Sequence, residues 1–252
     1  MSKYGAREVA GAGAVLAIVG VFLDAIQTIS YWELDGTIAW TGLVLGGAAL
    51  LLVVVGYAGV GLDGWLFAIG AALTGYWAWF PALSAFDGWD ETGAGMWLCL
   101  GGAVLIALGA AASLSLAGLV ETTPGGISFP TVVSGVGIAL VFPAIFLDAQ
   151  QSASYWDGDG LGILMLVLAS LCALAWAATI AGVRTRGLDS ALTLVLLGLV
   201  AFNPIALAFN DLGEIGAGGW LALAGGILAA GGTWSARGVE AGSAPNAATR
   251  PA

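Results

Sequence analysis

The sequence has 252 residues, of which 60% are hydrophobic and 9% are charged, and six basic against sixteen acidic residues give a net charge of −10. Soluble domains carry about 25% charged residues, so the composition excludes an ordinary soluble domain and predicts an all-α, polytopic membrane helix bundle. The acidic excess argues against nucleic-acid binding and is typical of proteins from halophilic sources.

Missing residue types exclude several kinds of site. Histidine is absent and Lys3 is the only lysine, so the chain has no His-ligated haem and no retinal Schiff base inside the membrane. Cys99 and Cys172 lie in apolar runs without CxxC spacing and are interpreted as small buried residues. No phosphate-binding loop, HExxH or nucleophile elbow is present. We expect no cofactor and no enzymatic activity, while a membrane aspartyl enzyme stays open if Asp24 and Asp148 meet.

Eight segments are long and apolar enough to span a bilayer. A hydrocarbon core of about 30 Å is crossed by roughly 20 apolar residues in a helix. The first segment is interpreted as a spanning helix and not a cleavable signal peptide, because its far end carries polar residues. The predicted helices are 9–30, 38–61, 65–85, 94–118, 130–154, 161–182, 189–208 and 216–235.

The basic residues predict the orientation in the plasma membrane, since cytoplasmic loops are enriched in Lys and Arg. With eight spans, every basic residue falls on one side, so both termini are predicted to be cytoplasmic. These residues are Lys3, Arg7, Arg184, Arg186, Arg237 and Arg250.

The opposite loops contain nine carboxylates and no basic residue. They form either a solvated acidic surface or an electrostatic funnel that concentrates cations at the outer side. The carboxylates are those of Glu33, Asp35, Asp87, Asp90, Glu91, Asp157, Asp159, Asp211 and Glu214.

The two halves of the chain repeat one another. Residues 23–36 match residues 147–160 at an offset of 124, with nine of the fourteen positions identical, and residues 81–87 match 204–210 at an offset of 123. A four-helix unit predicts parallel repeats related by an axis along the membrane normal. The predicted domains are a first repeat over 1–121, a second over 129–237 and a disordered cytoplasmic tail over 238–252.

The repeated signature Leu-Asp-Ala-x-Gln-x-x-Ser-Tyr-Trp supplies the candidate site. At 3.6 residues per turn, its Asp, Gln and Tyr share one helix face just below the outer interface. An ionisable group there either binds a cation, proton or substrate, or bonds to a neighbouring helix as a structural contact. The candidate ion- or substrate-binding residues are Asp24, Gln27, Tyr31, Asp148, Gln151 and Tyr155.

Pro81 and Pro204 are predicted to kink their helices, and the freed carbonyls either line a cavity or are satisfied by neighbours. Asn203 in the second half replaces Phe80 of the first, so the halves are not equivalent.

Two functions remain open from the sequence. The first is a small transporter or an ion- or proton-conducting protein, with a monovalent cation or proton as its ligand. The second is a structural or assembly subunit of a membrane complex without transport activity. The lipid bilayer is the one partner that both functions require, and protein partners are unknown.

Overall fold

A computed structural model describes most of the chain, and the described part is mostly helical, in agreement with the predicted all-α class. The described residues are 3–26, 29–34, 36–82, 92–116, 127–150, 153–157, 160–182, 187–207 and 212–243.

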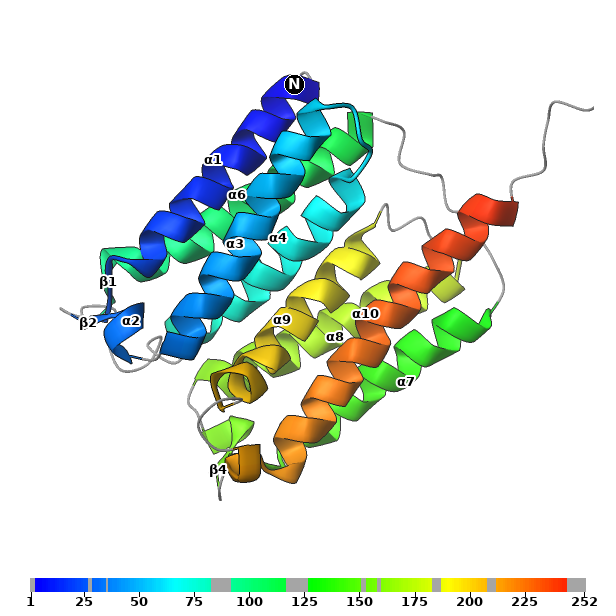
Figure 1. The fold of residues 1–252 in the computed structure, drawn as a ribbon. Coiled ribbons are helices and arrows are strands. Elements are labelled where there is room, and N and C mark those ends of the chain that lie inside the picture. The colour runs from blue at the N-terminus through cyan, green and yellow to red at the C-terminus, as the bar shows by residue number, and fades with distance from the viewer. Residues whose placement is uncertain are drawn as a thin grey trace, which may run out of the picture.

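The long helices form two groups that lie side by side (Figure 1). The group formed by the earlier part of the chain contains α1 (Lys3–Val21), α3 (Gly36–Tyr57), α4 (Asp63–Trp77) and α6 (Ala94–Leu116). The later group contains α7 (Phe129–Ala144), α8 (Gly160–Ile180), α9 (Leu188–Leu207) and α10 (Ala217–Ser243).

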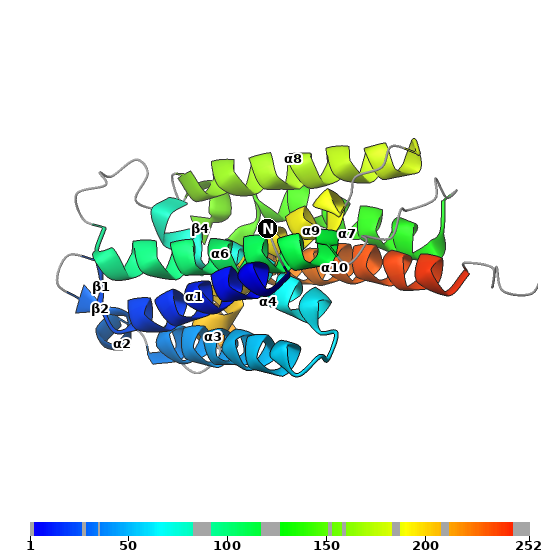
Figure 2. The same ribbon diagram turned by 90° about the horizontal axis from the view of Figure 1, so that it is seen from above.

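The same pairs of helices pack together in each group. In the first, α6 packs against α1 and α4, and α3 packs against α1; in the second, α10 packs against α7 and α9, and α8 packs against α7. The two groups meet chiefly where α4 packs against α9. As a result, α3 and α8 lie on opposite outer sides of the molecule (Figure 2).

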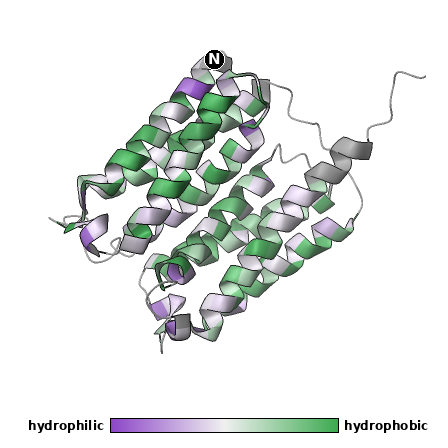
Figure 3. Cartoon of the chain, in the orientation of Figure 1, coloured by the Kyte–Doolittle hydropathy of each residue, from purple (hydrophilic) through white to green (hydrophobic). Residues whose placement is uncertain are grey.

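Four described helices are long and apolar enough to cross a membrane, namely α3, α6 over Ala94–Leu114, α8 and α9. Hydrophobic residues run along the helices, and the more polar residues gather near the helix ends (Figure 3). In α8, only 28% of the spanning stretch is buried inside the molecule. In α9, which packs against α4 of the other group, 56% of that stretch is buried. Apolar helices this exposed indicate a membrane protein.

Two of the predicted segments are too long. The predicted helix 9–30 ends at Val21, and the predicted helix 130–154 ends at Ala144. Each is followed by a short antiparallel hairpin, formed by β1 (Asp24–Ile26) with β2 (Ile29–Ser30) and by β3 (Asp148–Gln150) with β4 (Ala153–Ser154). The helical interpretation of the signature is therefore wrong.

A proline explains the early end of α4. Pro81 cannot donate to the carbonyl of Trp77 and its ring crowds that carbonyl, and α4 ends at Trp77. A short helical stretch over 79–82 follows the break at Ala78. Pro143 similarly precedes the last residue of α7, whereas Pro204 lies inside α9, which continues to Leu207.

The boundary between α4 and α9 depends on two glycines. A Cβ atom added to Gly75 would lie 1.8 Å from the carbonyl oxygen of Val195, and one added to Gly198 would lie 1.8 Å from that of Ala72. Only glycine permits so close an approach of two helix backbones.

Two further sequence predictions can be compared with the structure. Cys99 and Cys172 are buried, at 0% and 1% exposure, and both are free thiols. The last helix α10 extends to Ser243, beyond the predicted end of the second repeat at residue 237. Residues 244–252 of the predicted tail lie outside the described residues.

Candidate functional site

Each copy of the signature forms a hairpin at the end of its helix group. Asp24 pairs with Ser30 across the first hairpin, and Asp148 pairs with Ser154 across the second. Both aspartates are exposed. Gln27 and Gln151 lie outside the described residues, between the paired strands.

The two tyrosines of the signature point away from this exposed position. Tyr31 is 0% exposed and Tyr155 is 2% exposed. Because a hairpin separates each tyrosine from its aspartate, the Asp-Gln-Tyr face predicted from helical spacing does not form. The structure therefore places the four described site residues at two separate ends of the molecule's helix groups, each with an exposed carboxylate in the hairpin and a buried phenol directly after it.

Each signature leads into a capping box, a hydrogen-bonded helix start that was not predicted from the sequence. The backbone N–H and hydroxyl of Ser30 donate to the Glu33 carboxylate at 2.9 and 3.0 Å, at the start of the short helix α2 (Tyr31–Leu34). Those of Ser154 donate to Asp157 at 2.8 and 2.8 Å, at the start of the 3-10 helix η2 (Tyr155–Asp157). The spacing Ser-x-x-Glu is the recognisable signal of this motif.

These bonds also change the acidity of the two capping carboxylates. Hydrogen bonds from the backbone N–H and hydroxyl of Ser30 hold the pKa of Glu33 below its usual value, and those of Ser154 do the same for Asp157. A hydrogen bond to a carboxylate favours its charged form. Both carboxylates thus act as charged helix caps.

Glycines hold each hairpin against the last helix of its group. The backbone N–H of Gly93 donates to the Ala25 carbonyl at 2.9 Å, and that of Gly216 donates to the Ala149 carbonyl at 3.0 Å. A Cβ atom at Gly93 would lie 2.0 Å from the Asp24 carbonyl oxygen, so a larger residue cannot occupy this position.

The buried tyrosines belong to an aromatic cluster where α4 meets α9. The ring of Tyr31 lies 4.8 Å from Trp77, and the ring of Tyr155 lies 6.0 Å from Trp79. Phe202 of α9 stacks on Trp79 at 4.7 Å and so joins the two groups. Burial raises the pKa of both tyrosines, which keeps them neutral.

Polar atoms are enclosed within this cluster. Among the described residues, the hydroxyl of Tyr31 is buried without a hydrogen-bond partner, and the buried hydroxyl of Tyr155 interacts with the side chain of Asn203. Asn203, next to the helix proline Pro204, is 6% exposed. Buried polar groups are usually paired, so this is a second place, distinct from the hairpins, where a polar ligand could be recognised.

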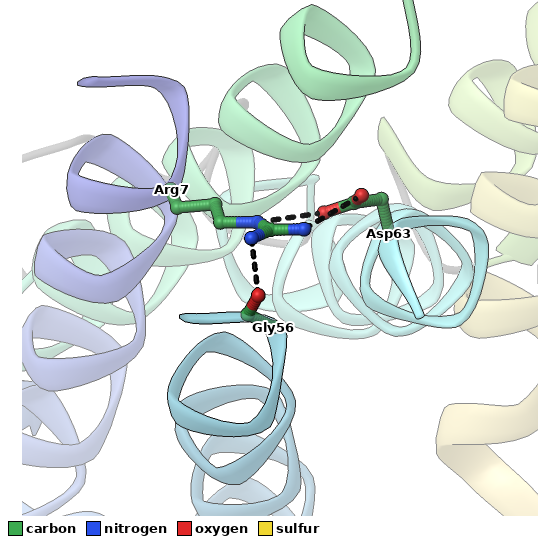
Figure 4. A network of polar contacts seen from close by, with 3 residues as sticks. All are labelled: Arg7, Gly56 and Asp63. Carbon is green, nitrogen blue, oxygen red and sulfur yellow. Dashed lines mark hydrogen bonds and ion pairs between the residues drawn. The ribbon is translucent and has the colours of Figure 1, made fainter. Parts of the chain in front are cut away.

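A buried ion pair at the opposite end of the first group was not predicted (Figure 4). The Arg7 guanidinium donates to the Asp63 carboxylate from Nε at 3.1 Å and from Nη2 at 3.0 Å, and it also donates to the Gly56 carbonyl. Arg7 is 6% exposed and Asp63 is 8% exposed. One side chain thereby joins α1, the end of α3 and the start of α4.

The known proteins give no independent guide to these sites, because no protein-family model, curated protein or solved structure matches the chain.

Proposed function

We propose that the chain is a plasma-membrane protein with eight spanning helices, arranged as two parallel four-helix repeats with both termini in the cytoplasm. The sequence offsets support the repeat, as do the equivalent helix pairs in the two groups. The hairpin pairings are also equivalent. Asp24 pairs with Ser30 and Asp148 pairs with Ser154, and each residue of the second pair lies 124 residues after its counterpart in the first.

Within this architecture, we propose a structural or assembly role in the membrane. One observation supports this proposal: in each helix group, the described residues of the signature make structural contacts at one end of the group. Its serine caps a short helix, its alanine carbonyl accepts a hydrogen bond from a glycine just before the last helix, and its tyrosine packs in the core. Asp24 and Asp148 are left exposed. An aspartate that carried an ion through the membrane would instead lie in a cavity or against protein.

Transport of a monovalent cation or proton is the second candidate. The buried phenols of Tyr31 and Tyr155 and the amide of Asn203 favour it, because they place polar groups between the two halves. Parallel-repeat transporters bind their substrates at such an interface.

Flux measurements in proteoliposomes separate the two candidates. A structural role predicts that Na⁺, K⁺ and H⁺ flux equals that of empty vesicles of the same lipid. Transport through the signature predicts flux that the double substitution Asp24→Asn with Asp148→Asn abolishes. A third outcome is wild-type flux that the double variant retains and that Asn203→Leu lowers. This outcome would place transport at the aromatic cluster and refute the structural role.

A further inference from the structure

The exposed aromatic side chains lie at the ends of the helices. Nine tryptophan, tyrosine and phenylalanine residues are exposed among the described side chains, and each lies within five residues of an end of a helix. The middle parts of the helices expose aliphatic side chains instead, such as Val44 and Leu51 of α3 and Leu171 of α8. Aromatic rings gather at the two interfaces of a bilayer, whereas aliphatic side chains face the hydrocarbon core.

Six of the nine lie at the end of the molecule that carries both hairpins (Figure 1). The ring of Phe22 lies 6.0 Å from that of Trp32, and the ring of Phe146 lies 5.3 Å from that of Trp156, so the same aromatic pair flanks each hairpin. The glycine contacts described above hold the starts of α6 and α10 beside the hairpins. These six residues, called the hairpin-end belt, are Phe22, Trp40, Trp97, Phe146, Trp156 and Trp220.

The remaining three form a far-end belt, at the end of α3, the start of α4 and the start of α7. They are Tyr57, Trp65 and Phe129, with 46%, 59% and 81% exposure. Two stretches of chain connect the belts, since Tyr57 lies 17 residues after Trp40 and Phe146 lies 17 residues after Phe129. At 1.5 Å per helical residue, each stretch covers about 26 Å. The two halves therefore give the same separation independently.

Charged residues begin just outside the belts. Neither connecting stretch contains a charged residue. The exposed Asp24 and Asp148 lie two residues beyond Phe22 and Phe146, at the hairpin end. An exposed carboxylate at this level meets headgroups and water, and so avoids the free-energy cost of an ionised group in hydrocarbon.

We propose that the two belts lie at the two interfaces of the bilayer, and that the protein fits a membrane with a hydrocarbon core of about 26 Å or less. A tilt of the helices shortens their reach along the membrane normal, so the helical separation of about 26 Å is an upper limit. A typical core is about 30 Å thick. The partner of this surface is thus a thin bilayer. The inference rests on the membrane location in the proposed function, and neither on the number of spans nor on the structural role.

The test is the thermal stability of the full chain in phosphatidylcholine vesicles of increasing thickness. The acyl chains lengthen in steps from dimyristoleoyl to dierucoyl, and X-ray scattering measures the hydrocarbon thickness of each vesicle. Hydrophobic mismatch raises the free energy of the folded protein. We expect the Tm to be highest in vesicles whose core is about 26 Å thick or thinner, and to fall in dierucoyl vesicles.

A variant that moves one ring of the belt makes the test specific. Trp40 and Val44 are 59% and 61% exposed, one turn apart on α3. The double substitution Trp40→Val with Val44→Trp moves the ring about 6 Å towards Tyr57. We expect the thickness of highest Tm to decrease. The matched control Trp40→Tyr keeps an aromatic ring in place and should keep the wild-type thickness.

The far-end belt offers a second variant in the other half. Phe129→Val with Val132→Phe moves a ring towards Phe146, onto a side chain that is 44% exposed. It should also decrease the thickness of highest Tm. General destabilisation by either swap lowers the Tm in every vesicle and leaves that thickness unchanged, so the position of the maximum reports on the belt and its height does not.

Three outcomes would overturn the proposal. The first is a wild-type Tm that is independent of acyl-chain length or highest in the thickest vesicles. The second is an unchanged thickness of highest Tm in both swap variants. The third is a changed thickness in Trp40→Tyr. Ion flux enters none of these measurements, so their failure is distinct from failure of the proposed structural role.

Discussion

At the scale of single residues, Arg7 joins three helices through one guanidinium group. It pairs with Asp63 and with the Gly56 carbonyl, in positions 56 and 49 residues away in the chain. The sequence predicted Arg7 only as a basic residue on the cytoplasmic side. Its partner could not be identified by spacing, because the contact depends on how α1 and α4 pack. A buried charge requires such a partner, since an unpaired one is strongly destabilising.

Removing one member of this pair should therefore lower the free energy of unfolding more than removing both. We expect Arg7→Met and Asp63→Asn each to lower the free energy of unfolding by about 3–5 kcal/mol. The double variant Arg7→Met with Asp63→Leu should recover most of this loss, because no unpaired charge remains. Chemical unfolding in detergent measures the cycle. Additive losses in the double variant would show that the two side chains do not interact.

The signature shows how far a local pattern can mislead. Its repetition was recognised from the sequence, but Asp24, Gln27 and Tyr31 were predicted to share a helix face. The strand between Asp24 and Ile26 contains no glycine or proline to mark a hairpin, and the run before it is continuously apolar. The capping box beginning at Ser30 was the available signal, because it marks a helix start and not a helix interior.

The contact between the first hairpin and Gly93 gives a prediction with a control in the helix that follows, α6. Gly93→Ala places a methyl group against the Asp24 carbonyl and should lower the free energy of unfolding by at least about 1–3 kcal/mol. Gly101→Ala, in the middle of α6, meets nothing within 4 Å and should be neutral or stabilising by about 0.5–1 kcal/mol. Equal effects of the two substitutions on the unfolding midpoint would argue against the hairpin contact.

At the scale of helices, the positions of all eight long elements could be predicted from hydrophobic length, but their ends could not. Pro81 follows the end of α4, which has 15 residues, and α7 has 16 residues with Pro143 inside it. A hydropathy pattern does not register a missing backbone donor. It also does not show which helices meet, although the small residues of α4 and α9 are typical of close helix packing.

The packing of α4 against α9 should be sensitive to one methyl group. Gly75→Ala and Gly198→Ala each force the helix backbones apart, because the added Cβ atom would lie 1.8 Å from a carbonyl oxygen. We expect a loss of at least about 1–3 kcal/mol of stability and weaker contact between the halves. Cross-linking between cysteines placed on α4 and α9 would measure that contact. The control is Gly47→Ala on α3, where a Cβ atom meets nothing within 4 Å.

At the scale of the whole molecule, the sequence predicted two related halves, and the fold contains two groups with equivalent helix pairs. The asymmetry between them was predicted from Phe80 and Asn203. The structure adds another difference, since the first group contains the Arg7–Asp63 pair and the second contains a cavity beside Asp189.

The central claim is that the two halves cross the membrane in the same direction. It is tested by single cysteines at equivalent exposed hairpin positions, Ile29→Cys and Ala153→Cys, in a background without Cys99 and Cys172. A membrane-impermeant maleimide should label both positions from the outer side of sealed vesicles. It should label Thr185→Cys, which lies between α8 and α9 in the sequence, from the cytoplasmic side. Labelling of the two hairpins from opposite sides would contradict the parallel arrangement.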